Sequence, residues 1–273
     1  MLRIISLLLV TFTVVDADEP QFLEPLDQTM TAEADGSEQR YVVLAPAKHT
    51  GDQPVDVMIA LHGHGSDRWQ FVRDGRPECL ESRRCAAAAG MLFVSPDYRA
   101  RTSWMSPLAE QDLLQLIGIL KREYKVRHVV LCGGSMGGTA ALAFAALHPE
   151  QIDAVVSLNG TANLVEYDKF QDAIAAAYGG TKEEVPDVYR SRSAELHADR
   201  LLRMPVAATT GGKDTLVPAD SVLRLMQRLQ KDGGRTLLLH REDGGHSTNA
   251  ADTHAAITFV LRQLAETAAE PSR

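Results

Sequence analysis

The chain has 273 residues, of which 45% are hydrophobic and 23% are charged, as is usual for a globular protein. The 28 Lys and Arg residues against 36 Asp and Glu residues give a net charge of −8, and the basic residues are interspersed along the chain. Because a nucleic-acid partner requires clustered cations, this composition argues against one.

The first 17 residues are predicted to form a secretory signal peptide. Arg3 precedes an apolar run at residues 4–15, and small residues end the segment at Ala17. The run is shorter than the ~20 residues that cross a bilayer, so a membrane anchor is the weaker interpretation. We therefore expect a secreted or periplasmic protein without a stable membrane anchor after processing.

Strands and helices are expected to alternate after an extended, polar lead-in at residues 18–40, within one domain at residues 41–273. Apolar runs typical of strands lie at residues 41–44, 55–61, 91–94, 128–131, 154–158, 206–209 and 236–239. Stretches typical of helices lie at residues 108–124, 136–147, 219–230 and 250–265. This alternation predicts an α/β fold with a mainly parallel sheet and helices on both faces, and ligands at the carboxyl ends of the strands.

Residues 161–203 interrupt the alternation. They are longer than a crossover helix requires and contain several aromatic residues, a Gly-Gly pair and Pro186. We interpret them as a small cap insertion over the carboxyl-terminal edge of the sheet, where they could form one wall of a pocket. A longer helical crossover with a loop is the alternative.

The three cysteines do not suggest a metal site, because no C-x-x-C pair is present. Cys79 and Cys85 enclose five residues of a region that resembles a loop, so a short disulfide between them is one interpretation and two buried free thiols are the other. Cys132 ends an apolar run and is predicted to be a small buried side chain rather than a reactive thiol.

A serine lies between glycines where an expected strand meets an expected helix. The residues Gly133-Gly-Ser135-Met-Gly137 match the pattern G-x-S-x-G. A strand that turns into a helix at one residue leaves little room for neighbouring side chains, and it presents the hydroxyl group at the carboxyl edge of the sheet. This context indicates that Ser135 is a nucleophile.

A serine nucleophile needs a base and a group that orients the base. Asp214 follows the expected strand at residues 206–209, and His246 follows the next one, at residues 236–239. Both therefore belong to the same edge of the sheet as Ser135. Asp243 is an alternative acid, while His240, His254 and His148 are predicted to be structural.

The order nucleophile, acid, histidine resembles that of the α/β-hydrolase family, and within it the secreted esterase and prolyl-oligopeptidase-like branches. The resemblance covers about residues 41–268. It implies that Ser135 attacks, that His246 acts as general base and then general acid, and that Asp214 orients the imidazole.

The resemblance also implies an oxyanion hole. One donor is the backbone N–H of Met136, directly after the nucleophile. The other comes from the turn Leu61-His-Gly-His64-Gly65, with His64 as the expected donor, Gly63 or Gly65 as alternatives, and the side chain of His62 as a structural brace.

The same turn allows a different chemistry. His62 and His64 followed by Asp67 are similar to the histidine pair of metallo-hydrolases, although Ser66 stands where a carboxylate is expected. The serine constellation makes this zinc alternative the weaker one, so we expect no metal and no cofactor; the glycines around Ser135 lack the spacing of a dinucleotide fingerprint.

Side chains near this edge are candidates for substrate binding. Tyr98, Trp104 and Trp69 either line the pocket or pack beneath the insertion. Arg99 and Arg101 are either ligands for an acidic substrate such as an uronate or solvated loop cations.

The expected activity is hydrolysis of carboxylic esters through an acyl-enzyme, and the resemblance implies short acyl, acetyl or feruloyl esters of carbohydrates. The partner is then a small-molecule or polysaccharide-linked ester. A small prolyl-oligopeptidase-like peptidase is the main alternative, and thioester hydrolysis or acyl transfer is also open. A non-catalytic binding protein on the same fold is the alternative from another class.

Overall fold

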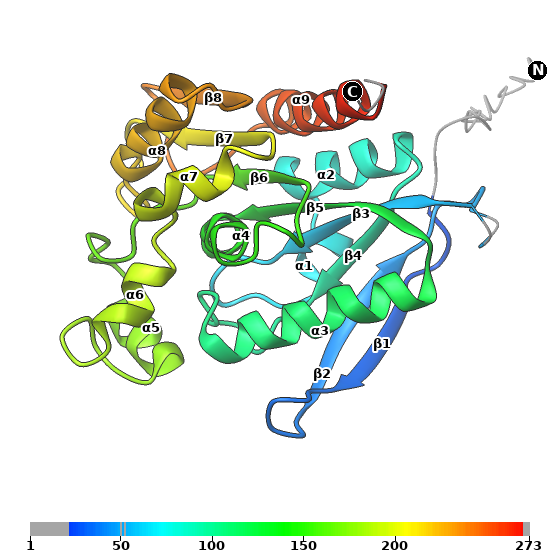
Figure 1. The fold of residues 1–273 in the computed structure, drawn as a ribbon, viewed down its shortest axis with the longest axis horizontal. Helices are drawn as coiled ribbons and strands as arrows, with labels where there is room; N and C mark the ends of the chain where they lie inside the picture. Colours follow the sequence, from blue (N-terminus) through cyan, green and yellow to red (C-terminus); the bar gives the residue numbers. More distant parts are fainter. Residues whose placement is uncertain (1–21, 50, 52, 270–273) are drawn as a thin grey trace, which may run out of the picture.

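The computed structural model describes residues 22–49, 51 and 53–269 of the chain, so the predicted signal peptide lies outside the described residues. The described part contains one sheet of eight strands in the order β1-β2-β4-β3-β5-β6-β7-β8 (Figure 1). The strands are β1 (Leu26–Thr31), β2 (Glu38–Leu44), β3 (Val55–Leu61), β4 (Leu92–Pro96), β5 (Val126–Gly134), β6 (Ala154–Leu158), β7 (Val206–Gly211) and β8 (Thr236–Arg241). The pairs β1–β2 and β2–β4 are antiparallel and all others are parallel, which confirms the predicted fold class.

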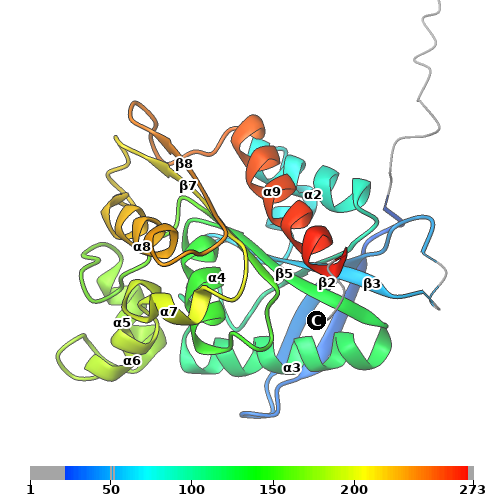
Figure 2. The same cartoon turned by 45° about the horizontal axis from the view of Figure 1, so that its top comes forward.

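Helices cover both faces of the sheet (Figures 1 and 2). One apolar core includes residues of α3 (Pro107–Glu123), α4 (Met136–Leu147) and α8 (Asp220–Lys231), and the other includes residues of α1 (Gln70–Arg73), α2 (Pro77–Ala88) and α9 (Ala250–Ala269). Alternate residues of β3 enter the two cores, with Ile59 on the first side and Met58 on the second. Both faces are therefore buried, as central parallel strands require.

The lead-in contributes more to the sheet than the sequence suggests. Residues 26–31 form β1, which pairs antiparallel with β2 and stands at the edge of the sheet. Its side chains are exposed or only half-buried, so the strand has no apolar run by which the sequence would reveal it.

Of the two interpretations of Cys79 and Cys85, the disulfide is wrong and the pair of buried free thiols is confirmed. Both residues lie on α2, which was expected to be a loop, and both are buried free thiols. Six residues along an α-helix correspond to a rise of about 9 Å, which is beyond the reach of a disulfide. Cys132 is buried in β5 as expected, and burial raises the pKa of all three thiols to about 12.

Residues 161–203 contain the short helices α5 (Gln171–Tyr178), α6 (Pro186–Ser191), η1 (Ala194–His197) and α7 (Ala198–Leu201). In Figure 1, α5 and α6 lie to one side of the sheet. None of the described helices has the length and apolar character needed to span a membrane.

Candidate active site

Ser135 is the single residue between the end of β5 and the start of α4, with φ 57° and ψ −119°. Two flanking glycines make this turn possible, because a Cβ atom at Gly137 would stand 1.9 Å from the carbonyl oxygen of Leu61 and one at Gly133 would stand 2.4 Å from the backbone of Gly137. The Ser135 N–H donates to Leu158 in β6 at 2.8 Å. The chain thus holds a strained backbone that presents one hydroxyl group at the carboxyl edge of the sheet.

The carboxylate of Asp214 is buried in the loop after β7, and both of its oxygens accept hydrogen bonds. One oxygen accepts the backbone N–H groups of Leu216 at 3.0 Å and Val217 at 2.9 Å. The other oxygen lies 2.7 Å from Nδ1 of His246. Because a carboxylate only accepts, Nδ1 carries the proton of this hydrogen bond and Nε2 is left to accept.

His246 connects the acid to the nucleophile, since its Nε2 lies 2.9 Å from the Ser135 hydroxyl oxygen. The loop that carries it follows β8 and is fixed by Asn159, which donates from its amide to the Gly245 carbonyl at 3.2 Å and accepts from Thr248. Gly211 permits the close approach of this loop, because a Cβ atom there would stand 2.2 Å from the Gly245 carbonyl oxygen. The structure therefore brings the three predicted residues into one hydrogen-bonded chain.

The other acid and histidine candidates lie in different contacts. Asp243 is 91% exposed and pairs with Lys213, so it does not orient His246. His240 bonds to the Thr210 hydroxyl, and His148 pairs with Glu110. These two histidines therefore lie in contacts other than the hydrogen bonds of Ser135, His246 and Asp214.

The turn after β3 leaves one backbone donor available. The N–H of Gly63 donates to the side chain of Gln70 and that of Gly65 donates to the carbonyl of Arg101, both at 2.7 Å. Among the hydrogen bonds of the described residues, none uses the N–H of His64 or of Met136. Of the three residues considered at this turn, His64 is the one with a donor to offer.

His62 braces this turn from within. Its ring is fully buried, its two nitrogens lie 2.9 and 3.1 Å from the carbonyl oxygens of Gly63 and Asp97, and it packs against Tyr98. Burial lowers the pKa of His62. Because both ring nitrogens face carbonyl oxygens, His62 has no nitrogen to give to zinc, and the zinc alternative loses its first ligand.

A cavity of about 400 Å³ opens at Ser135 and His246. The remaining lining residues are Gly63, His64, Gln70, Phe71, Arg76, Glu78, Gly134, Leu158, Phe170, Leu216, Ser247 and Thr248. Phe170 comes from the segment at residues 161–203, which therefore forms part of the wall.

The three aromatic residues predicted to bind substrate are not among the lining residues, so that interpretation is wrong and the packing alternative holds. Trp104 is fully buried beneath the rings of Tyr167 and Phe170, where its indole N–H donates to Nδ1 of His64 at 3.1 Å. Tyr98 is buried and donates to the carbonyl of His62, and Trp69 packs under the guanidinium of Arg73. These large aromatic residues are conspicuous in the sequence, and in the structure they form the packed support beneath the pocket.

The two arginines considered for an acidic substrate are likewise engaged elsewhere. Arg99 pairs with Asp35 and Asp112 at 2.7 Å each, and Arg101 donates to the carbonyl of Gly65 at 2.8 Å. Sequence reasoning instead missed Gln70, Arg76 and Phe170, which line the cavity from α1, from the residue before α2 and from the residue before α5.

Fold and site together define a serine hydrolase of the α/β-hydrolase type. The chain belongs to the prolyl oligopeptidase family, whose sequence model matches residues 111–267. The matched region includes Ser135, Asp214 and His246.

Solved structures with this fold include both peptidases and esterases. A protein described as a dipeptidyl aminopeptidase IV, from Bacteroides ovatus, is 19% identical with a TM-score of 0.70 and is matched over 90% of this chain and 36% of its own length. A ferulic acid esterase is 17% identical with a TM-score of 0.67 over 87% of this chain and 97% of the esterase. An S-formylglutathione hydrolase from Agrobacterium tumefaciens is 18% identical with a TM-score of 0.67 over 89% of this chain and 94% of the hydrolase.

These similarities establish the fold, and the chain spans only about a third of the length of the Bacteroides protein. None of the curated protein sequences compared with the chain is a match.

Proposed function

We propose that this protein is a serine esterase that hydrolyses carboxylic esters through an acyl-enzyme on Ser135. The observation that carries the proposal is the pair of contacts at His246, with 2.7 Å to Asp214 and 2.9 Å to the Ser135 hydroxyl. A serine hydroxyl is a weak nucleophile until a base removes its proton, and this geometry provides the base.

In the proposed reaction, Ser135 attacks the ester carbonyl while Nε2 of His246 takes its proton. The alcohol then leaves with that proton, and a water molecule activated by the same nitrogen releases the acid. Asp214 keeps the ring in the required tautomer and stabilises the imidazolium.

The negative oxygen formed by the attack would be stabilised by the backbone N–H groups of Met136 and His64. Each such donor lowers a barrier of this kind by about 3 kcal/mol. This assignment is supported by the hydrogen bonds of the turn: the N–H groups of Gly63 and Gly65 already donate to other acceptors, while no described hydrogen bond uses the N–H groups of Met136 and His64. Met136 also begins α4, so the positive end of the helix dipole lies at the same place.

For the substrate we propose short acyl esters, including acetyl or feruloyl groups on carbohydrates. A cavity of about 400 Å³ has room for a small acyl group, and Phe170 and Leu216 give it apolar surface beside the polar Gln70. The similarity to a ferulic acid esterase over 97% of that chain supports this size of substrate.

Peptide hydrolysis is the second candidate, and the match to the prolyl oligopeptidase family favours it. The two are separated by initial rates on a panel of p-nitrophenyl acyl esters, methyl ferulate and acetylated xylan against a panel of peptide p-nitroanilides. We expect turnover of the esters, and turnover confined to the peptides would replace the proposal.

Labelling by a fluorophosphonate tests the nucleophile directly. We expect stoichiometric labelling of the protein, none in Ser135→Ala, and unchanged labelling in the matched control Ser191→Ala, whose hydroxyl bonds to the Val188 carbonyl in α6. Absence of labelling in a folded protein would favour a non-catalytic binding role on this fold.

We also propose that the protein is exported and that residues 1–17 are removed. The support is the basic start, the short apolar run and the small residues before Asp18. Amino-terminal sequencing of protein recovered from the medium or the periplasm is expected to begin at Asp18, and recovery of the chain starting at Met1 inside the cell would contradict this.

A further inference from the structure

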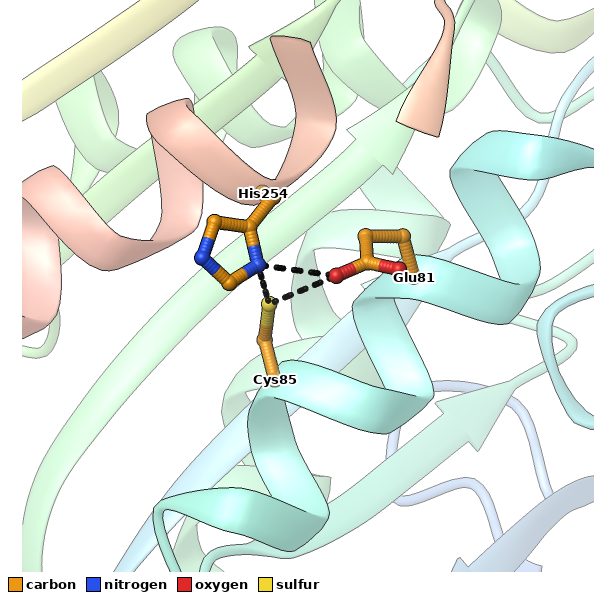
Figure 3. A group of neighbouring side chains, drawn as sticks. All are labelled: Glu81, Cys85 and His254. Atoms are coloured by element: carbon orange, nitrogen blue, oxygen red, sulfur yellow. Dashed lines mark hydrogen bonds and ion pairs between the residues drawn. The ribbon is translucent and has the colours of Figure 1, made fainter. Parts of the chain in front are cut away.

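On the face of the sheet away from α3 and α4, two helices that are far apart in the sequence lie side by side. These are α2 and α9, which Figures 1 and 2 show next to each other. Figure 3 shows three side chains that meet between them: Glu81 and Cys85, one turn apart on α2, and His254 on α9. The serine chemistry uses none of the three.

The donor atoms of these residues form a close triangle. Cys85 Sγ lies 3.6 Å from His254 Nδ1 and 3.7 Å from Glu81 Oε1, and the nitrogen and oxygen are 2.8 Å apart (Figure 3). Two ligands of one tetrahedral zinc ion stand about 3.3 to 3.6 Å apart, as the usual zinc bond lengths require. The two sulfur distances lie within about 0.1 Å of this range, and the nitrogen–oxygen distance must increase by roughly 0.5 Å.

We propose that Glu81, Cys85 and His254 bind one divalent metal ion of the zinc class, with water as the fourth ligand. A sulfur, an imidazole nitrogen and a carboxylate oxygen together suit zinc, whereas magnesium and calcium prefer oxygen donors throughout. One thiolate and one carboxylate also neutralise the two positive charges of the ion. Binding breaks the S–H bond of Cys85, forms an S–metal bond and releases the thiol proton to solvent, while the proton that Nδ1 of His254 donates to Glu81 is replaced by one on Nε2, so that Nδ1 is free to bind the metal.

The surroundings allow an ion to enter and stay. The side chain of Cys85 is buried at the base of the site, the Glu81 side chain is 14% exposed, and the His254 side chain is 60% exposed. The exposed ring of His254 can move by the required fraction of an ångström, and the open side leaves room for a water ligand. Arg84 lies 3.9 Å from the other oxygen of Glu81, so the oxygen that faces the site remains available.

A metal at this position would join α2 to α9. Both helices begin beside the candidate active site, because α2 carries Glu78 of the cavity lining and α9 follows the loop of His246. An ion that binds only the folded chain adds to its stability by mass action. The metal would therefore stabilise the fold around the pocket without taking part in the ester chemistry.

Titration of the purified, metal-free full chain with Zn²⁺ and with Co²⁺ tests the proposal. We expect one equivalent to bind, a thiolate-to-cobalt charge-transfer band in the near ultraviolet, and a melting temperature that rises with Zn²⁺. Cys79 and Cys132 are completely buried and far less able to give that band.

Variants assign the ligands. Cys85→Ser is expected to lose the cobalt band, and Glu81→Gln and His254→Ala are expected to weaken Zn²⁺ binding by more than the roughly 10- to 100-fold that an outer contact is worth. His197 is a half-buried histidine on η1, away from α2 and α9, so His197→Ala is the matched control and should bind like the wild type. Circular dichroism establishes that each variant is folded. No band in the wild type, or equal Zn²⁺ affinity in the wild type and His254→Ala, would overturn the proposal.

Discussion

The nucleophile turn and the segment at residues 161–203 both border the same cavity, but they are built in opposite ways. In the turn, backbone packs on backbone: β5, α4 and the end of β3 approach so closely that Gly137 has no space for even one carbon atom. In the segment, four short helices are held by side chains, such as Ser193, which accepts the N–H of Leu164, and Arg192, which donates to the carbonyl of Met105.

The difference indicates a division of tasks. The turn fixes the reacting atoms and can tolerate almost no change, since any shift moves the Ser135 hydroxyl relative to His246. The segment provides a wall through Phe170, and it can vary wherever its side chains do not face the cavity. Chemistry is therefore expected to depend on the sheet edge, and substrate preference on the segment.

The largest effect is expected at the acid behind the histidine. Asp214→Asn should lower kcat by about 10⁴-fold, because an amide favours the wrong tautomer of His246. Steady-state kinetics on p-nitrophenyl acetate measures this. Asp243→Asn, which changes an exposed acid on the same loop as His246, should leave kcat within about twofold of the wild type. A large loss of kcat in Asp243→Asn, with little loss in Asp214→Asn, would show that Asp243 and not Asp214 orients His246.

The next effect separates the two regions by stability. Gly137→Ala should cost more than about 4 kcal/mol or prevent folding, because its Cβ would overlap the Leu61 carbonyl. Gly179 ends α5 in the segment at φ 81° and has open space around it. Gly179→Ala should therefore lower the free energy of unfolding by about 1–2 kcal/mol, from backbone strain alone. Urea unfolding measures the loss of unfolding free energy in both variants, and similar losses would contradict the proposed difference between the turn and the segment.

A smaller effect is expected at the wall of the cavity. Phe170→Ala should raise KM for feruloyl and other aryl esters by roughly tenfold while kcat stays near the wild-type value, because it removes apolar surface from the pocket. Leu196→Ala, in the same segment but outside the cavity lining, is the control with unchanged KM. A fall in kcat in Phe170→Ala would mean that the segment also positions the reacting atoms.

The smallest effect concerns the pH dependence of stability at His64, which lines the same cavity and packs against Phe170 of the segment. Burial lowers the pKa of His64 below 6.5, and its neutral ring accepts the hydrogen bond from Trp104. The unfolded chain then binds the proton more readily, so this contribution to stability is complete above pH 6.5 and is lost as the pH falls through that value toward the folded pKa. His64→Gln should show a shallower fall of unfolding free energy over this range; equal slopes would exclude the role.

The sheet edge could be predicted from sequence because its signals are local. The glycines around Ser135 mark a strand-to-helix turn, and Asp214 and His246 each follow an apolar strand whose end is easy to recognise. Once the strands are parallel, their ends meet at one edge, and the three residues need no further information to converge.

The rest depended on contacts between distant residues. Phe170 lines the cavity because the segment folds back over His64, and the residues next to Phe170 in the sequence do not predict this contact. The strand β1 has no apolar run, and α2 begins at Pro77 and has no clear apolar stripe, so a loop with a disulfide was a reasonable but wrong expectation. Trp104 was recognisable as important, but burial beneath Phe170 makes it a support rather than a lining residue.

Peptide mapping of an acid-quenched reaction with p-nitrophenyl acetate tests most directly whether Ser135 carries the acyl group. We expect a burst of p-nitrophenol close to one equivalent and an acetyl group on the peptide that contains Ser135. An acetyl group found on another residue, or a linear time course with no acylated peptide, would contradict it.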